Sequence, residues 1–241
     1  MLKGPTTIAA ICLAAGLLVP LPALAQTTQT LALYGAALQI DGTAGVGDRT
    51  TDISVDVDEF IDNLEMGGLA SYRLDTPRWS LAVEGAFFGL GQSQDGVSMD
   101  VDMTVAQLTA GYRFTESFDA YVGVRYTDLS ARVAGTRPVS GESFDVESGD
   151  DFLDPIVGVR VVAPLSEKWL IQAQGDVGGF GVDMESQWQA AFDVGYRPGE
   201  TVTIWLGYRA LDQDFEDAGE GGRFDMDVTY QGPQLGVAFR F

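Results

Sequence analysis

The stretch DPIVGVRVVAPLSEKWLIQAQGDVGGFG, from Asp154 to Gly181, decides the fold because apolar and polar residues alternate in both of its halves. Valines at 157, 159 and 161 alternate with Gly158 and Arg160, and Trp169 opens a second alternating run. Successive side chains of a β-strand point to opposite faces, so each half is a strand with one apolar and one polar face. The short polar segment 164–168 joins them, and the pattern predicts a β-hairpin.

Two environments suit this hairpin. Long alternating strands, a tight turn and an aromatic residue beside the turn, here Trp169, are typical of a transmembrane barrel, whose apolar band faces lipid between aromatic girdles. A soluble barrel or a β-sandwich with its core on the apolar face shows the same alternation. The hairpin alone leaves both interpretations open.

The N-terminus has the pattern of a secretory signal peptide. Lys3 precedes an apolar run over residues 8–18, and Ala23-Leu24-Ala25 has the small residues that signal peptidase requires. We therefore expect residues 1–25 to be removed on export and residues 26–241 to form one domain. The only cysteine, Cys12, lies in the removed segment, so the mature chain should have no disulfide and no zinc site.

Composition excludes several functions. The net charge is -21, from 35 acidic and 14 basic residues, so nucleic acid is not a plausible partner. The sequence contains no histidine, which removes the usual general base of hydrolases, and we expect no enzyme activity. No run of 18 apolar residues follows the signal segment although 46% of the chain is hydrophobic, so a membrane-spanning form must be a closed barrel.

The turns favour the membrane barrel over the soluble one. Alternating segments recur along the chain, and the short connections between them fall at 75–78, 115–117, 164–168 and 198–200. Longer, acidic connections fall in between, at 42–62, 91–102, 130–151 and 212–227. Short turns at one end and long loops at the other are typical of outer-membrane barrels. The sequence predicts an all-β fold, a single antiparallel up-and-down transmembrane barrel of about ten strands, with eight as the alternative.

Two segments near the N-terminus carry further expectations. The first strand, predicted over Thr30 to Asp41, should place Leu33 and Gly35 on its weakly polar lumen side and Ala32 and Tyr34 outside. Residues 51–62 should form an extracellular excursion with one helical turn at 59–62, part of which could fold back into the lumen as a small plug.

The C-terminus and a repeated tripeptide carry a family resemblance. Apolar residues at every second position end in Phe239 and Phe241, which looks like the assembly signal of outer-membrane barrels, and Gly-Tyr-Arg or Gly-Val-Arg recurs at 111, 123, 195 and 207. From about residue 30 to 241 the chain resembles the OmpA- and OmpW-type small barrel proteins as a class, apart from its higher strand count. The resemblance implies an outer-membrane location among lipid and lipopolysaccharide, and insertion by the barrel-assembly machinery through the C-terminal strand.

Charged residues on the polar faces form the main candidate site. They are expected to point into the lumen as a charge ladder: Arg73, Glu84, Arg113, Arg125, Asp154, Arg160, Asp176, Asp193, Arg197, Arg209 and Arg240. Charges that face a lumen either pair with one another or line water. Paired charges would fill a narrow interior, which we favour at this strand number, whereas unpaired ones would line a selective pore. Arg160 and Asp176 are expected to be diagonal neighbours on the opening hairpin, within reach through the length of the arginine.

A second candidate is the acidic segment Asp212, Asp214, Glu216 and Asp217. Carboxylates suit Ca²⁺ or Mg²⁺, but the spacing is not that of an EF-hand, so only weak association is expected and no cofactor. The sequence thus predicts a non-enzymatic envelope protein with acidic extracellular loops and a structural or surface-interaction role. The alternative is a narrow channel for small solutes or ions.

Overall fold

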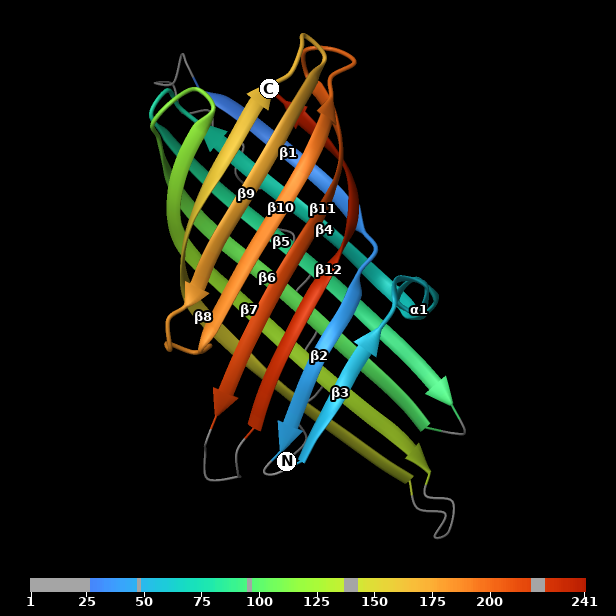
Figure 1. Cartoon of the computed structure of the whole chain (residues 1–241). Coiled ribbons are helices and arrows are strands. Elements are labelled where there is room, and N and C mark those ends of the chain that lie inside the picture. Colours follow the sequence, from blue (N-terminus) through green and yellow to red (C-terminus); the bar gives the residue numbers. More distant parts are fainter. Residues whose placement is uncertain (1–26, 47–48, 95–96, 137–142, 218–223) are drawn as a thin grey trace, which may run out of the picture.

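The computed structural model describes residues 27–46, 49–94, 97–136, 143–217 and 224–241. Within these ranges ten strands close an antiparallel barrel, which confirms the all-β prediction and the choice of ten strands over eight (Figure 1). The predicted signal peptide, residues 1–25, lies outside the described residues. No helix in the described part of the chain is long and apolar enough to span a membrane.

The closed wall consists of β1 (Thr28–Ala36), β4 (Leu64–Asp75), β5 (Trp79–Gln94), β6 (Val97–Arg113), β7 (Phe118–Thr136), β8 (Ser143–Pro164), β9 (Trp169–Gly179), β10 (Ser186–Tyr196), β11 (Val202–Asp217) and β12 (Phe224–Arg240). Each strand from β4 to β12 pairs with the next, and β1 pairs with both β4 and β12. Phe241 completes the closure, since its N–H donates to the carbonyl of Gln29 (3.0 Å) and its carbonyl accepts from the Gln29 N–H (2.9 Å).

The two ends of the barrel differ, as the sequence predicts. Both ends of the described chain and the four short turns lie at the upper end in Figure 1, where backbone hydrogen bonds such as Leu165 N–H to Trp169 O (2.8 Å) close the turns. Barrels of this type place their short turns on the periplasmic side. We call this the periplasmic end and the opposite one the extracellular end.

The outer face carries an apolar band between aromatic residues. Val122 is 62% exposed and Leu206 63%, as expected of side chains that face lipid rather than water. At the periplasmic end Trp79 packs edge-on against Tyr112 with ring centroids 5.0 Å apart, and Trp169 lies 5.0 Å from Tyr196. These outward residues would be a strongly unfavourable surface in water, so the barrel spans a membrane.

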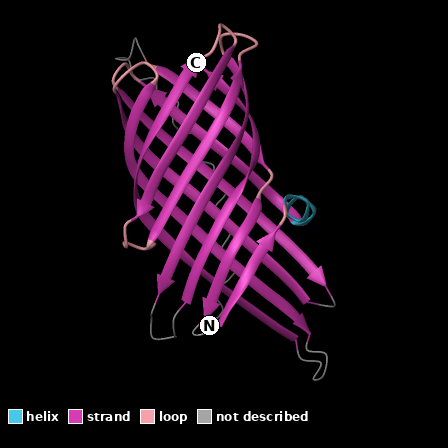
Figure 2. Ribbon diagram, in the orientation of Figure 1, coloured by secondary structure: helices cyan, strands magenta, loops and turns pink. Residues whose placement is uncertain are grey.

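The predicted lengths of the extracellular loops are wrong, because most of the residues assigned to these loops continue the strands (Figure 2). The predicted loop 130–151, for example, is largely β7 and β8, which pair up to Thr136 and Ser143. The sequence interpretation ended each strand where the apolar face ended. Beyond the lipid the outward side chains become polar, as at Asp227 of β12, while inward ones such as Met226 and Val228 stay apolar and buried. The apolar residues thus change faces although strand pairing continues.

The prediction of which face of the first strand points into the lumen is also wrong. Ala32 is 4% exposed inside the barrel and Leu33 is 48% exposed outside, the reverse of the expectation. Both faces of β1 are apolar, so hydropathy cannot identify the lumen side. The register decides it, because Leu33 pairs with Val237 on the outer face of β12.

The predicted first strand is also broken in two. β1 ends at Ala36, and β2 (Gln39–Val46) pairs with β3 (Arg49–Val55) as a hairpin at the extracellular end. The break lies opposite Pro233 of β12, which has no N–H to donate to the ladder. Its carbonyl still accepts from the Ala37 N–H at 3.1 Å, so β1 and β2 follow β12 in succession.

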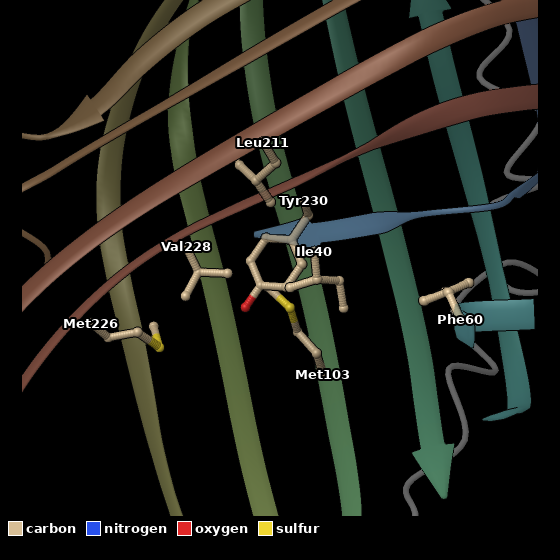
Figure 3. Packing of buried hydrophobic residues seen from close by; sticks show 7 residues of the cluster. All are labelled: Ile40, Phe60, Met103, Leu211, Met226, Val228 and Tyr230. Atoms are coloured by element: carbon tan, nitrogen blue, oxygen red, sulfur yellow. The ribbon is translucent and has the colours of Figure 1, made fainter. Parts of the chain in front are cut away.

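The segment after β3 forms the helix α1 (Val57–Asn63), longer than the single turn expected. Its Phe60 is 1% exposed and packs edge-on against Phe88 of β5, with ring centroids 5.7 Å apart. Phe60 belongs to an apolar cluster in the extracellular half of the lumen (Figure 3), whose buried members are Ile40, Phe60, Met103, Leu211, Met226, Val228 and Tyr230. We call it the upper cluster because it lies toward the outside of the cell, although the extracellular end is the lower one in Figure 1.

A charge in the apolar band tests the membrane assignment. Val122→Arg should lower the free energy of unfolding by about 2–4 kcal/mol in lipid vesicles, because the charge would face hydrocarbon. Asp151→Arg, on the outer face of β8 beyond the band, should change it by only about 0–1 kcal/mol. Urea unfolding followed by the gel-mobility difference between unboiled and boiled protein measures both. Equal effects of the two variants would contradict the assignment.

Candidate functional site

A buried polar network centred on Arg125 of β7 lies in the middle of the lumen. Arg125 and Asp176 both have 0% exposed side chains, and the guanidinium Nη2 donates to Asp176 Oδ1 at 2.7 Å. Nη2 also donates to Gln107 Oε1 at 2.9 Å, and Nη1 donates to Gln187 Oε1 at 3.0 Å. Tyr121 donates its hydroxyl to the second oxygen of Asp176 at 2.9 Å. We call these five side chains the central plug.

A second polar layer crosses the lumen next to the plug. Arg209 of β11 pairs with Glu84 of β5, on the opposite wall, and donates through Nε to Gln234 Oε1 at 3.2 Å. Gln234 in turn donates to Asp193 Oδ1 at 2.7 Å. Asp193 is 1% exposed and is held by an amide rather than by an arginine.

On the periplasmic side of these layers lies a polar vestibule of 350 Å³. Arg73 pairs with Asp75 and Asp119, and Arg113 Nη2 lies 2.6 Å from Asp75. Arg160, Arg197 and Arg240, the remaining arginines of the predicted ladder, also line this space. The structure thus separates the ladder into a buried part at mid-height of the lumen and a part that lines the periplasmic vestibule.

Arg160 and Asp176 do not form the contact that the sequence left open. They are diagonal in the register, as expected, since Asp176 lies opposite Gly158 and Arg160 opposite Gln174. Arg160 instead donates to Gln172 Oε1 at 2.7 Å and lies 4.0 Å from Asp119. Asp176 turns to Arg125 because that guanidinium is fully enclosed and requires a carboxylate.

Asp154 lies in the interior but caps a loop rather than joining the ladder of ion pairs. Its Oδ1 accepts the backbone N–H groups of Asp183 (3.0 Å) and Met184 (3.1 Å), in the loop between β9 and β10. That loop passes through positive φ at Gly179 (83°), Phe180 (55°) and Gly181 (67°), a conformation that favours glycine. Asp154 fixes the turn, which places the fully buried Met184 in the lumen.

The acidic segment of β11 lies on the outer wall. Asp212, Asp214 and Glu216 share the face of the lipid-exposed Leu206 and Tyr208, and Asp214 lies directly opposite Asp227 of β12. Asp212 Oδ2 accepts the hydroxyl of Thr229 at 2.6 Å. Of the predicted cation site, the side chain of Asp217 lies outside the described part. Among described residues no group of three or more acidic, cysteine or histidine side chains has the arrangement of a metal site.

The charge of this wall shifts one ionisation. Partial burial and then the neighbouring Asp227 and Glu185 raise the pKa of Asp214 above its usual value. Like charges directly opposite on paired strands are destabilising. We call Asp212, Asp214, Glu216, Asp225 and Asp227 the acidic wall; protons or cations would reduce the repulsion between its directly opposite pair, Asp214 and Asp227.

Glutamines and a tyrosine were missing from the predicted site. Gln107, Gln187 and Gln234 supply most of the neutral partners of the buried charges, and Tyr121 reaches Asp176 across Gly158, where a β-carbon would lie only 2.5 Å from the tyrosine ring. The recurrence of glutamine on polar faces could have indicated them. Which charge each would contact depends on contacts across the lumen, which alternation does not encode.

A mutant cycle tests the central plug. Arg125→Ala should lower the free energy of unfolding by about 3–5 kcal/mol, because it leaves Asp176 buried without its counter-charge. The double variant Arg125→Met with Asp176→Leu should recover most of this loss, since apolar replacement of a whole buried pair is often neutral. The exposed pair Arg132 and Asp145 provides the matched control, and Arg132→Ala should leave the unfolding midpoint unchanged. Equal losses for Arg125→Ala and Arg132→Ala would contradict a sealed plug.

The raised pKa of Asp214 predicts a pH effect with a definite sign. A group whose pKa is higher in the folded than in the unfolded state stabilises the fold at low pH, and this stabilisation is lost as pH rises through the folded-state pKa. Asp214→Asn should therefore slow amide exchange at neutral pH in the paired segments 211–217 of β11 and 224–230 of β12. It should have no effect on this exchange near pH 4. Millimolar Mg²⁺ should slow the same amides in the wild type. Slower exchange in the variant at both pH values would contradict the charge explanation.

Comparisons with known proteins identify the fold. No protein-family profile and no curated protein sequence matches the chain. Among solved structures, the outer membrane protease OmpT from Escherichia coli matches with a TM-score of 0.58 at 8% identity, covering 91% of this chain and 98% of OmpT. Ail from Yersinia pestis, in complex with sucrose octasulfate, matches at 11% identity with a TM-score of 0.44, over 90% and 99% of the two chains. The translocator domain of NalP from Neisseria meningitidis matches at 10% identity with a TM-score of 0.45, over 91% of each chain. The closed ten-stranded topology, the apolar band and the likeness to the fold of OmpT together make the chain an outer-membrane-type β-barrel.

Proposed function

We propose that this protein is a non-conducting, non-enzymatic barrel of the outer membrane that acts from the cell surface. The observation that carries the proposal is the central plug, in which Arg125 and Asp176 have no exposed side-chain surface. A pore needs a continuous water path, and the side chains of this pair are completely enclosed by protein. The alternative interpretation, a narrow channel, would need the plug to move.

The polar interior offers little to catalysis. The carboxylates of Asp176 and Glu84 are each bound to an arginine, and Asp154 is bound to backbone amides. A general base must be free to accept a proton from a substrate, and the chain has no histidine for that task. These features support a structural use of the interior charges.

The acidic wall supports an interaction at the outer surface. It begins at Asp212, which lies directly opposite Trp188 and four residues past Tyr208, both of them exposed on the outer face. Aromatic residues at this level of a barrel meet lipid headgroups. Lipopolysaccharide phosphates at that level carry negative charge, and hard divalent cations bind both carboxylate and phosphate oxygens. We propose that Ca²⁺ or Mg²⁺ bridges the wall to lipopolysaccharide. Insertion through the C-terminal strand, where Phe239 and Phe241 are exposed, is part of the same proposal.

Planar-bilayer recording tests the sealed lumen. The wild-type barrel should show no resolved single-channel conductance, and Arg125→Ala with Asp176→Ala should open steps, because both halves of the plug are removed. Arg132→Ala with Asp145→Ala, an exposed pair on the extracellular strands, is the control and should stay silent. Regular conductance steps of the wild type would favour the channel instead.

A binding comparison tests the surface interaction. In vesicles that contain lipopolysaccharide, Mg²⁺ should raise the unfolding midpoint of the wild type, and a chelator should reverse the change. Asp214→Asn with Asp227→Asn should remove most of this response, whereas Asp58→Asn with Asp62→Asn on α1 should keep it. A response of equal size in phosphatidylcholine vesicles would show that lipopolysaccharide is not the partner.

A further inference from the structure

The barrel wall contains a seam beside α1. β4 pairs with β1 only as far as the partners Tyr34 and Leu69, although its pairing with β5 continues to Leu64. Beyond that point the chain that follows β1 pairs with β12 and β3 instead. Within the described strands, residues 64–68 of β4 therefore have a strand partner on one side only. Figure 1 shows α1 at this place, between β3 and β4.

A cavity of 90 Å³ lies at the seam and is lined from both sides of the wall. Phe87 and Gly68 lie on the outer face of the barrel, and Phe87 is 37% exposed toward the membrane. The other walls come from the inside and are largely apolar, with Leu38, Phe60, Leu69, Phe88, Met103 and Leu211 among them. The cavity thus leads from the lipid-facing surface to the upper cluster.

One polar side chain in this apolar space lacks a partner. Gln189 of β10 lines the cavity and is 4% exposed, yet its Nε2 group has no hydrogen-bond acceptor. Arg209 and Gln234, which also line the cavity, are engaged with Glu84 and Asp193. An unpaired buried donor is unfavourable, because its hydrogen bond to water has been lost and not replaced. A bound molecule with an acceptor oxygen would remove that cost.

We propose that this cavity binds small, largely apolar molecules that carry one hydrogen-bond acceptor, and that they reach it from the membrane through the seam. The apolar walls hold the body of the ligand, and the Gln189 amide donates to its oxygen. A carboxylate is a poorer fit than a neutral carbonyl or hydroxyl, because the nearby charges of Arg209 and Glu84 already neutralise each other. This site goes beyond the surface role and does not require the central plug to open.

The size of the cavity sets the limit on the ligand. A cavity of about 150 Å³ is known to hold benzene, so the 90 Å³ available here suits a molecule with fewer than the six non-hydrogen atoms of benzene. A larger ligand needs the ring of Phe60 to leave, and α1 is attached to the wall mainly through that residue. The ring of Phe60 therefore limits the size of the ligand that the cavity can hold.

Two isosteric probes test the proposal in detergent micelles. Butanone and 2-methyl-1-butene have the same shape, but only butanone has an acceptor. Methionine methyl resonances report binding, because Met103 lines the cavity whereas Met184, equally buried, does not. With concentrations referred to the detergent phase, butanone should shift Met103 selectively and bind about fivefold more tightly than the alkene, the ratio that one hydrogen bond supplies.

Variants separate the hydrogen bond from the cavity. Gln189→Leu should abolish the preference for butanone, while Gln213→Leu, an equally buried glutamine on β11 outside the cavity, should preserve it. Phe60→Ala should admit cyclohexanone, which the wild type binds at least tenfold more weakly. A Met103 shift no larger than that of Met184, or a butanone preference that survives Gln189→Leu, would overturn the proposal. Should Gln189→Leu fail to fold, equal binding of the two probes by the wild type overturns it alone.

Discussion

The interior of this barrel depends on one enclosed charge, the guanidinium of Arg125. A cation without exposed surface is tolerated only when a carboxylate and further acceptors surround it, and here Asp176, Gln107 and Gln187 do so from three other strands. Gln107 is the direct neighbour of Arg125 on the adjacent strand β6, whereas Asp176 and Gln187 come from β9 and β10, which do not pair with β7. Satisfying Arg125 therefore ties β7 to β9 and β10 through the interior of the barrel. The glycine at 158 belongs to the same constraint, since it leaves room for Tyr121 to reach Asp176. The arrangement of polar side chains at mid-height of the lumen thus follows from the electrostatics of a single residue.

Alternation in the sequence was enough to predict the barrel, its ten strands, its short turns and the inward direction of Arg73, Arg125 and Asp176. It failed where the outer face of a strand is not the apolar one. In β1 both faces are apolar, and in the extracellular extensions the apolar residues, such as Met226 and Val228, face inward, so only pairing with a neighbour reveals the register. Contacts across the lumen are also absent from the pattern, which is why Asp154 was grouped with the ion pairs although it caps a loop.

The seam beside β4 raises a different physical problem. Backbone groups that face hydrocarbon without a partner are strongly unfavourable, and residues 64–68 have lost one neighbouring strand. The helix α1 and the hairpin of β2 and β3 lie over this edge, and Phe60 inserts an aromatic ring where strand pairing is missing. Such a cover is weaker than a hydrogen-bonded ladder, because one side chain holds it. The wall is therefore most easily opened at this place.

Polarity divides the lumen into two compartments. Toward the periplasm lies a vestibule of arginines and carboxylates, and toward the outside lies the upper cluster around Met103 and Tyr230. The central plug separates them, so a small apolar molecule in the upper compartment would have to cross buried ion pairs to reach the vestibule. That crossing is costly, whereas Phe60, Leu64 and Phe87, which line the cavity at the seam, are apolar. The arrangement favours a site that exchanges ligand with the surrounding membrane over a path that leads through the barrel.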